Sequence, residues 1–389
     1  MNDTRRGILL LVKSAITGTS QQVPQNFSLE EAYPWIKAHH ITPLAYDGAV
    51  RCGLSRENPM MARLFQDYYK CLIISRGQLA EINRIYDAFE KNNIAYMPLK
   101  GCNMKHRYPA PELRMMGDAD ILIRMEQYDA IRQLMTELGF QEKKVTDHEL
   151  VWKSQSLYLE LHRRVIPSYN LDMMEYFGDG WGLAKICRGN RYDMTPEDEW
   201  IYLFTHFAKH YRDGGIGCRH MVDLWVYLRT TQNLDEVYVK AELEKLRLLE
   251  FYMNIRKLIA VWFEGAQEDA MSEFLTEFIF TSGSWGQMEN RILSRTLRDS
   301  KRSALGFSGR LIYIRNTLFP GANVLQDKYT ILKKAPWTLP LVWLVRPFYK
   351  VVFESESLKI QEKNLEMLSQ GNVELRQQML RYVGLDYHE

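Results

Sequence analysis

Two aspartates, Asp118 and Asp120, stand one residue apart inside the apolar run DADILI. Side chains of a strand alternate between its two faces, so both carboxylates should point to one face, roughly 7 Å apart. A second run, LYLELH, places Glu160 and His162 on the face opposite to its leucines. If the two strands are neighbours, three carboxylates converge, and such a group is poorly tolerated unless cations lie between the acids. The natural cation is Mg²⁺, and a pair of Mg²⁺ ions is a common device for phosphoryl or nucleotidyl transfer.

The segment that contains these acids, residues 93–167, changes its hydrophobic period several times. It reads as a strand, a short helix, a strand, a helix and three short strands, which predicts a small α/β unit. The expected elements are a strand at 94–99, a short helix at 101–107, a strand at 118–123, a helix at 125–138, and strands within FQEKK, HELVWK and LYLELHRRV. Pro98 cannot donate to a ladder, so the first strand is expected to lie at a sheet edge or to carry a bulge.

Helical spacing dominates the rest of the chain. Residues 1–92 are expected to be helical, with Ser28 and Glu31 forming a capping box at the start of one helix. The helical period returns after about residue 166, and Thr195, which is followed by a proline, predicts the start of a strong helix. The prediction is an α+β protein with four segments, at 1–92, 93–167, 168–282 and 283–389.

The composition is that of an ordinary globular protein, with 46% hydrophobic and 25% charged residues. The formal net charge is +2, from 50 basic and 48 acidic residues, which gives no general drive toward nucleic acid. The five cysteines are scattered and show no zinc-binding spacing, so reduced thiols in a cytoplasmic protein are expected. No signal peptide and no membrane span are predicted.

An ordered set of motifs resembles the DNA polymerase β-like nucleotidyltransferase superfamily, and within it a bacterial nucleotidyltransferase family. The resemblance covers residues 93–165 and continues more loosely through His206, Arg219 and Asp223. It is moderately specific because several motifs occur in the family's order. These motifs are Leu99-Lys100-Gly101, Tyr108-Pro109, Arg114, Asp118-Ala119-Asp120 and Glu160-Leu161-His162.

The resemblance implies a polymerase β-like core and a role for each motif residue. Asp118 and Asp120 would bind two Mg²⁺ ions, with Mn²⁺ as an alternative. Glu160 would be the third carboxylate, acting either as a metal ligand or as the base for an attacking hydroxyl. Gly101 would let backbone amides approach a triphosphate, and Lys100 would neutralise phosphate charge.

The same resemblance implies further nucleotide contacts. Arg114 would bind phosphate bidentately, and His162 belongs to the same nucleotide-binding set. His210 and Arg219 would hold the nucleotide from the helical region. The implied substrate is a nucleoside triphosphate, with ATP favoured. The acceptor is unknown, and a protein side chain, small molecule or sugar is favoured over long nucleic acid.

Two other functions stay open on the sequence. Cys102 stands where the superfamily usually has glycine or serine, and the third acid is glutamate where aspartate is common, which would suit an inactive nucleotide-binding or regulatory protein. His206 and His210 lie one helical turn apart and, with Asp223, would suit a metal-dependent hydrolase. The simplest interpretation of this second group is a polar network between helices in which Asp223 pairs with Arg219.

The tryptophan-rich segment at 337–353 also has two interpretations. It would suit contact with a membrane surface, with Arg346 and Lys350 near the headgroups. Packing against the helical region or a protein partner is favoured over membrane contact.

Overall fold

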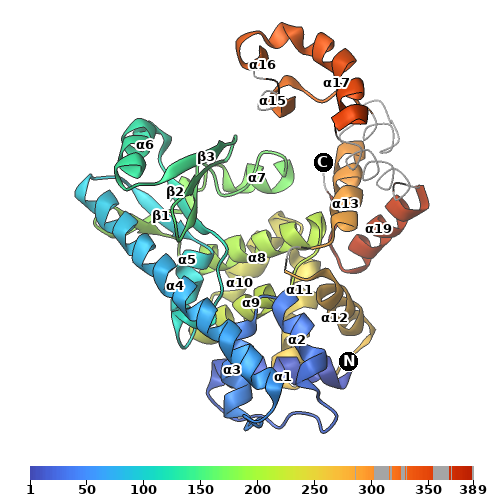
Figure 1. Ribbon diagram of the computed structural model, residues 1–389. Helices are drawn as coiled ribbons and strands as arrows, with labels where there is room; N and C mark the ends of the chain where they lie inside the picture. The colour runs from blue at the N-terminus through green and yellow to red at the C-terminus, as the bar shows by residue number, and fades with distance from the viewer. Residues whose placement is uncertain are drawn as a thin grey trace. The chain divides into compact units, whose positions relative to one another are not determined.

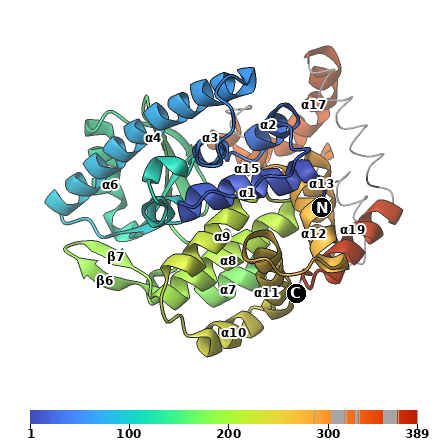
Figure 2. The ribbon, with the colours of Figure 1, turned by 90° about the horizontal axis from the view of Figure 1, so that it is seen from below.

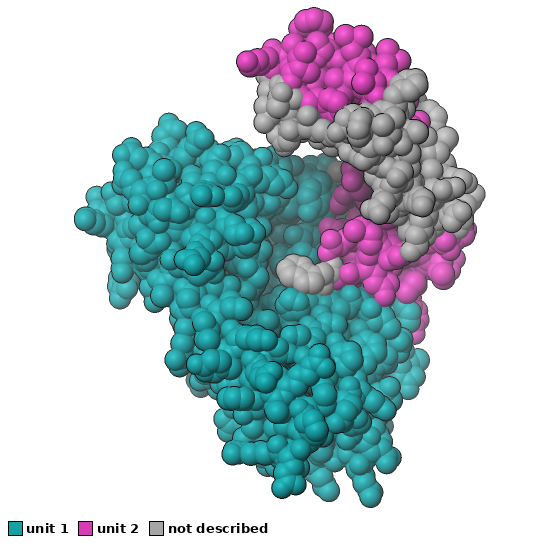
Figure 3. All heavy atoms as spheres, viewed as in Figure 1, with its two compact units in different colours: residues 1–210, 216–285 teal, residues 211–215, 286–389 magenta. Residues whose placement is uncertain are grey.

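The computed structural model describes residues 1–284, 286–301, 315, 318–325, 329, 331–353, 368 and 370–387. It divides into two compact units, which Figure 3 shows in different colours. The first unit comprises Met1–His210 and Ile216–Trp285, and the second comprises Tyr211–Gly215 and Gly286–Glu389. The four-segment division made from the sequence stays a prediction.

A mixed seven-stranded sheet lies in the first unit (Figure 1), with the strand order β3-β4-β5-β2-β1-β7-β6. Its β2–β5 and β1–β7 pairs are parallel and its other pairs are antiparallel. The mixed sheet and the many helices agree with the predicted α+β class. The strands are β1 (Tyr96–Leu99), β2 (Ala119–Ile123), β3 (Gln141–Val145), β4 (Glu149–Lys153), β5 (Tyr158–His162), β6 (Lys185–Arg188) and β7 (Arg191–Asp193).

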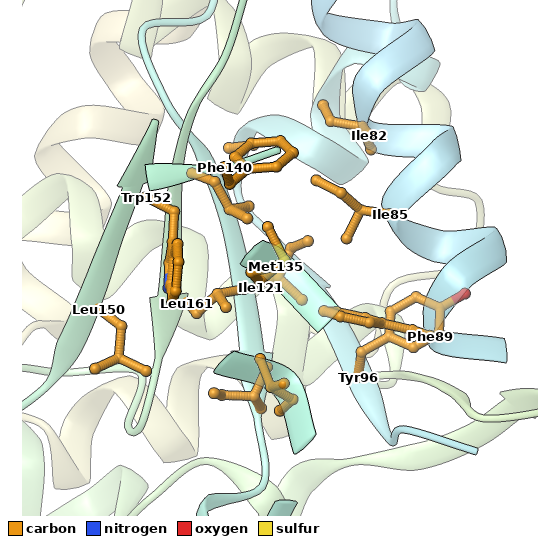
Figure 4. Packing of buried hydrophobic residues seen from close by; sticks show 14 of the residues in the cluster. Ile82, Ile85, Phe89, Tyr96, Ile121, Met135, Phe140, Leu150, Trp152 and Leu161 are labelled. Atoms are coloured by element: carbon orange, nitrogen blue, oxygen red, sulfur yellow. The ribbon is translucent and has the colours of Figure 1, made fainter. Parts of the chain in front are cut away.

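One face of this sheet is an apolar core. Ile121 on β2 and Leu161 on β5 point to this face, where α4 (Pro59–Lys91) and α6 (Tyr128–Glu137) cover them. Figure 4 shows Phe89 of α4 and Trp152 of β4 in the same cluster. Because strand residues alternate, burying these side chains forces the polar residues of β2 and β5 onto the opposite face.

Pro98 lies inside the sheet and is accommodated without a bulge. It is paired with Ile121 of β2, whereas the pairing of β1 with β7 is confined to Tyr96 and Arg191. The ladder on the β7 side therefore ends before Pro98, and no donor is needed from the proline there. At Pro98 the strand β1 thus has a ladder partner on one side alone, which is the edge position that was expected as one of two alternatives, and its pairing with β2 has no bulge.

Helices occupy the N-terminal region as predicted, and Ser28 caps α2 by accepting a hydrogen bond from the Glu31 backbone N–H at 3.3 Å. The side chain of Glu31 instead accepts a hydrogen bond from the Thr4 hydroxyl. The helices of this unit besides α4 and α6 are α1 (Asp3–Thr17), α2 (Leu29–Ala38), α3 (Thr42–Arg51), α5 (Gly101–Met104), α7 (Leu171–Phe177), α8 (Pro196–Asp213, which continues into the second unit), α9 (Cys218–Thr230), α10 (Glu236–Lys245), α11 (Leu249–Ile259) and α12 (Ala270–Ser282).

The hairpin of β6 and β7 was not predicted, since the helical period had been expected to return after about residue 166. Figure 2 shows the two strands side by side. Gly189 and Asn190 form the turn, and Gly189 adopts a positive φ of 57°. A Cβ at Gly189 would come within 2.4 Å of the Glu90 carboxylate, which also accepts a hydrogen bond from the Asn190 N–H. The Gly-Asn pair was the available sequence signal for this turn.

The second unit is helical wherever it has described regular structure. Its helices are α13 (Met288–Lys301), α15 (Ala322–Leu325), α16 (Ile331–Lys334), α17 (Leu339–Phe353) and α19 (Gln370–Tyr382). The helical spacing expected outside residues 93–167 is met at the C-terminal end by α19, while most of 358–369 lies outside the described residues. Among the described helices of the protein, none has the length and apolar character that crossing a bilayer requires.

Candidate active site

The register between β2 and β5 brings together two of the three predicted acids, Asp120 and Glu160. These strands are parallel, and Asp120 is paired directly with Glu160, so the two side chains leave the same face of the sheet. His162, two residues further along β5, shares that face. One ligand atom from each of Asp120, Glu160 and His162 lies within 4.8 Å of the others.

Asp120 is the most strongly bound member of this group. Its Oδ1 accepts hydrogen bonds from the Lys100 ammonium and from the His162 Nε2, each at 2.7 Å. Burial opposes ionisation of Asp120, but the Lys100 charge and the hydrogen bond from His162 outweigh it and hold the pKa of this carboxyl well below its usual range. Burial and the Lys100 charge act to lower the pKa of His162, but its hydrogen bonds with Asp120 and Glu160 outweigh them and raise it. Asp120 is therefore a fixed, ionised anchor.

Lys100 takes up this position through an unusual backbone conformation. It follows β1 directly and has φ 42° and ψ −111°, a region that residues with a Cβ rarely adopt. A conformation of this kind typically costs a few kcal/mol or less, and such strain gathers at functional sites. The Lys100–Asp120 contact fixes the connection between β1 and α5 next to the carboxylates.

A side chain at Gly101 would displace its neighbours. A Cβ at this position would lie 2.9 Å from both the Arg114 Nη1 and the Met116 Sδ. The next residue, Cys102, belongs to the apolar core, where burial raises the pKa of its thiol to about 12. Cys102 is therefore a neutral packing residue. Its burial in the apolar core accounts for a cysteine where the resemblance led us to expect glycine or serine.

Asp118 precedes β2 and is half-buried. Its pKa is raised to about 6, first by burial and then by the negative charges of Asp120 and Glu160, while Lys100 and Arg219 act weakly in the other direction. The three acids are thus within electrostatic range of one another. Asp118 carries charge that its neighbours do not fully compensate, which is the condition that favours a bound cation.

Arg114 and Arg219 both contact Asp223 on α9. The contact from Arg114 is bidentate, with Nε at 2.7 Å and Nη2 at 2.9 Å from the two carboxylate oxygens, and the Tyr108 hydroxyl adds a third hydrogen bond at 2.7 Å. Arg219 lies 3.4 Å from Asp223 and donates to His220 at 2.9 Å. Arg114 therefore joins the segment before β2 to α9, whereas the contacts of Arg219 lie within α9 itself. The Nη1 of Arg114 is buried without a hydrogen-bond partner.

His206 and His210 form a pair of their own. Their Nε2 atoms are 3.0 Å apart, and burial, followed by nearby positive charges, holds the pKa of each far below its ordinary value. Both rings are therefore neutral, with one donating to the other. Asp223 forms no three-residue ligand group with this pair among the described residues, which removes the structural basis of the hydrolase interpretation.

Two residues of the site escaped the sequence analysis. Glu149 on β4 is paired with His162 and contacts His148 at 2.8 Å, and the alternation in HELVWK was the signal that it shares the polar face. Tyr202 on α8 is buried beside the site, and its hydroxyl has no hydrogen-bond partner. Burial is the main cause of its raised pKa, with Asp120 and Glu160 acting in the same direction. No sequence pattern marks Tyr202.

The match to a protein family defines the class of this chain. A family described as uncharacterised nucleotidyltransferase matches residues 25–264, which is more than half of the chain. The chain belongs to this family, and so to a class that transfers nucleoside monophosphates. No curated protein and no solved structure matches it.

The donor set fits the divalent metals that nucleotidyltransferases typically use. Carboxylate oxygens are the ligands that Mg²⁺ prefers, and Asp120 and Glu160 supply them from adjacent strands, while Asp118 is held as a raised-pKa acid next to both. The additional imidazole of His162 is compatible with Mn²⁺ as well.

Proposed function

We propose that this protein transfers a nucleoside monophosphate from a nucleoside triphosphate to an acceptor hydroxyl on a polymerase β-like core, with release of pyrophosphate. The observation that carries the proposal is the direct pairing of Asp120 with Glu160 across parallel strands, with Asp118 close enough to be electrostatically repelled by both. Family membership supports the reaction class.

The exposure of the three carboxylates would decide which of them only bind metal ions and which also accepts a proton. Asp118, Asp120 and Glu160 would hold two Mg²⁺ ions, which when bound offset charge on the phosphate oxygens and align the attacking and leaving groups. The Asp120 side chain is 6% exposed and anchored by Lys100. The Glu160 side chain is 23% exposed, so it is the acid that an incoming hydroxyl can approach and to which it can give its proton.

The remaining residues would bind and orient the triphosphate. Lys100, held beside the carboxylates, would supply positive charge for a phosphate group. The backbone of the next residue, Gly101, would approach that phosphate. The unpartnered Nη1 of Arg114 is a free donor, whereas its other donors are fixed on Asp223. Arg219 adds positive charge near Asp118. His210, on α8, is within electrostatic range of Arg219. ATP is the favoured donor substrate, and the acceptor is a small molecule, sugar or protein side chain.

Transfer of label tests the proposal directly. Purified protein is incubated with Mg²⁺, each α-³²P-labelled triphosphate and candidate acceptors, and pyrophosphate release is measured in parallel. We expect Mg²⁺-dependent release that Asp118→Ala abolishes. The matched control is Asp172→Ala on α7, which removes an aspartate outside the acidic cluster. Triphosphate binding without turnover by any acceptor would favour the regulatory function instead, and turnover that survives in Asp118→Ala would contradict the metal assignment.

A further inference from the structure

The helix α17 has a well-packed inner face. Val342 is buried against Leu325 and Leu332, and Leu339 and Trp343 pack on the same small cluster. The Trp343 indole also donates a hydrogen bond to the Pro320 carbonyl at 2.9 Å. Figure 1 shows α15, α16 and α17 gathered together. The inner face therefore has its partner within the second unit and fixes the orientation of the helix.

The other face of α17 is apolar and exposed. Trp337, in the turn that precedes the helix, is 79% exposed, and Leu341, Leu344 and Val345 are 59%, 68% and 58% exposed. The spacing of four, three and one residues places these four side chains on one helical face. A contiguous apolar patch of this kind is unusual on a surface that faces only water and marks an interaction site. We call Trp337, Leu341, Leu344 and Val345 the outer face.

The composition of the sequence that carries the outer face identifies the partner that suits it. Residues 328–353 contain five lysines or arginines and no aspartate or glutamate, although the whole chain has a net charge of only +2. An apolar helical face combined with flanking basic residues and an exposed tryptophan is the pattern of helices that lie in the interface of an anionic membrane. Lys334, directly before the turn, is exposed and positioned to contact headgroups.

We propose that the outer face of α17 docks on the surface of an anionic phospholipid membrane. The helix would lie in the plane of the interface, since it has neither the length nor the continuous apolar character of a spanning helix. Trp337, Leu341, Leu344 and Val345 would enter the boundary between headgroups and acyl chains. The basic residues would supply an electrostatic contribution that salt weakens. This inference does not depend on the proposed nucleotidyl transfer.

Co-sedimentation of the full-length protein with vesicles tests the docking surface. We expect binding to vesicles of equal parts phosphatidylcholine and phosphatidylglycerol, little binding to phosphatidylcholine alone, and weaker binding as salt is raised. Leu341→Ser with Leu344→Ser should lower the binding at least about tenfold, since each leucine loses the apolar burial that it would gain. The matched control is Leu375→Ser on α19, which removes a leucine that is 55% exposed, and it should bind like the unmodified protein.

A second measurement keeps the proposal open to refutation if the double variant folds poorly. Brominated phosphatidylglycerol quenches tryptophans that enter the interface, so Trp337→Phe should remove most of the quenching while leaving sedimentation largely intact. The proposal is wrong if the protein ignores anionic vesicles, or if Trp337→Phe leaves the quenching unchanged. It is also wrong if the protein is a dimer that the double serine variant dissociates, because a second copy would then cover the outer face.

Discussion

Replacing Asp118 by asparagine should make the metal-free protein more stable, and the gain should depend on pH. The folded protein raises the pKa of Asp118 from its ordinary 3.8 to about 6. Below about pH 4 the group is protonated in the folded and the unfolded chain alike, so it contributes nothing. As the pH rises from about 4 to about 6, the unfolded chain releases this proton before the folded protein does, so stability is lost over this range and the loss is complete above about pH 6.

The magnitude follows from the size of this shift. A rise of about two pKa units corresponds to about 3 kcal/mol between the two protonation states. Asp118 is half-buried, so water screens part of the repulsion, and we expect Asp118→Asn to gain about 1–2 kcal/mol above pH 7. Urea unfolding in the presence of a chelator, repeated from about pH 4 to about pH 8, measures this gain.

Asp120→Asn provides the matched comparison, because it changes the same chemical group two residues away. Asp120 accepts from Lys100 and His162, so the substitution leaves buried cationic partners without their carboxylate and should cost about 3 kcal/mol. Both variants should lose transfer activity, yet their stabilities should move in opposite directions. A gain for Asp118→Asn that does not grow with pH, or a loss of stability in both variants, would refute the electrostatic description of the site.

Four further variants test separate parts of the site. Glu160→Gln keeps the size of the side chain but removes the proton acceptor, so kcat should fall on the order of a hundredfold or more while triphosphate binding, measured by calorimetry, stays nearly unchanged. Arg114→Lys cannot keep the bidentate contact with Asp223 and should lower stability by about 3 kcal/mol in thermal unfolding, whereas Arg219→Ala should weaken triphosphate binding several-fold with a small loss of stability. Tyr202→Phe removes a buried hydroxyl without a partner and should leave the free protein as stable or up to about 1 kcal/mol more stable, and a simultaneous fall in kcat/KM would assign the hydroxyl to the bound substrate.

The parts of the site that the sequence predicted are those that follow from alternation along strands. Burial of Ala119, Ile121 and Leu161 determines which way Asp120 and Glu160 must point, and periodicity alone contains that information. The parallel pairing of β2 with β5 then brings the acids together. The same reasoning would have found Glu149, had the run HELVWK been read as a neighbour of the second acidic strand.

The partners of Lys100 and Arg114 could not be predicted in this way, whereas the pair of Arg219 and Asp223, one helical turn apart, was predicted and is confirmed. Lys100, Arg114 and Arg219 are equally plausible phosphate ligands in the sequence, and a basic side chain can extend to any acid within several ångströms. In the structure Arg114 contacts Asp223, which comes from a helix more than a hundred residues further along the chain. Such a choice depends on the packing of α9 against the loop before β2, and no local pattern encodes that packing. The β6–β7 hairpin is a different case, because the Gly-Asn pair in the local sequence could have predicted its turn.

Two acids that are nearly equivalent in the sequence therefore receive opposite environments. Asp120 is enclosed and neutralised by Lys100 and His162, so its position and charge are fixed before any ligand arrives. Asp118 lies directly before the first residue of β2, and part of its negative charge is uncompensated. A cation that binds there would relieve electrostatic repulsion that is present in the folded protein. The two acids are complementary: the fixed geometry of Asp120 would position a metal ion, and the repulsion at Asp118 would favour its binding. The opposite stability changes expected for Asp118→Asn and Asp120→Asn are the direct measure of this division.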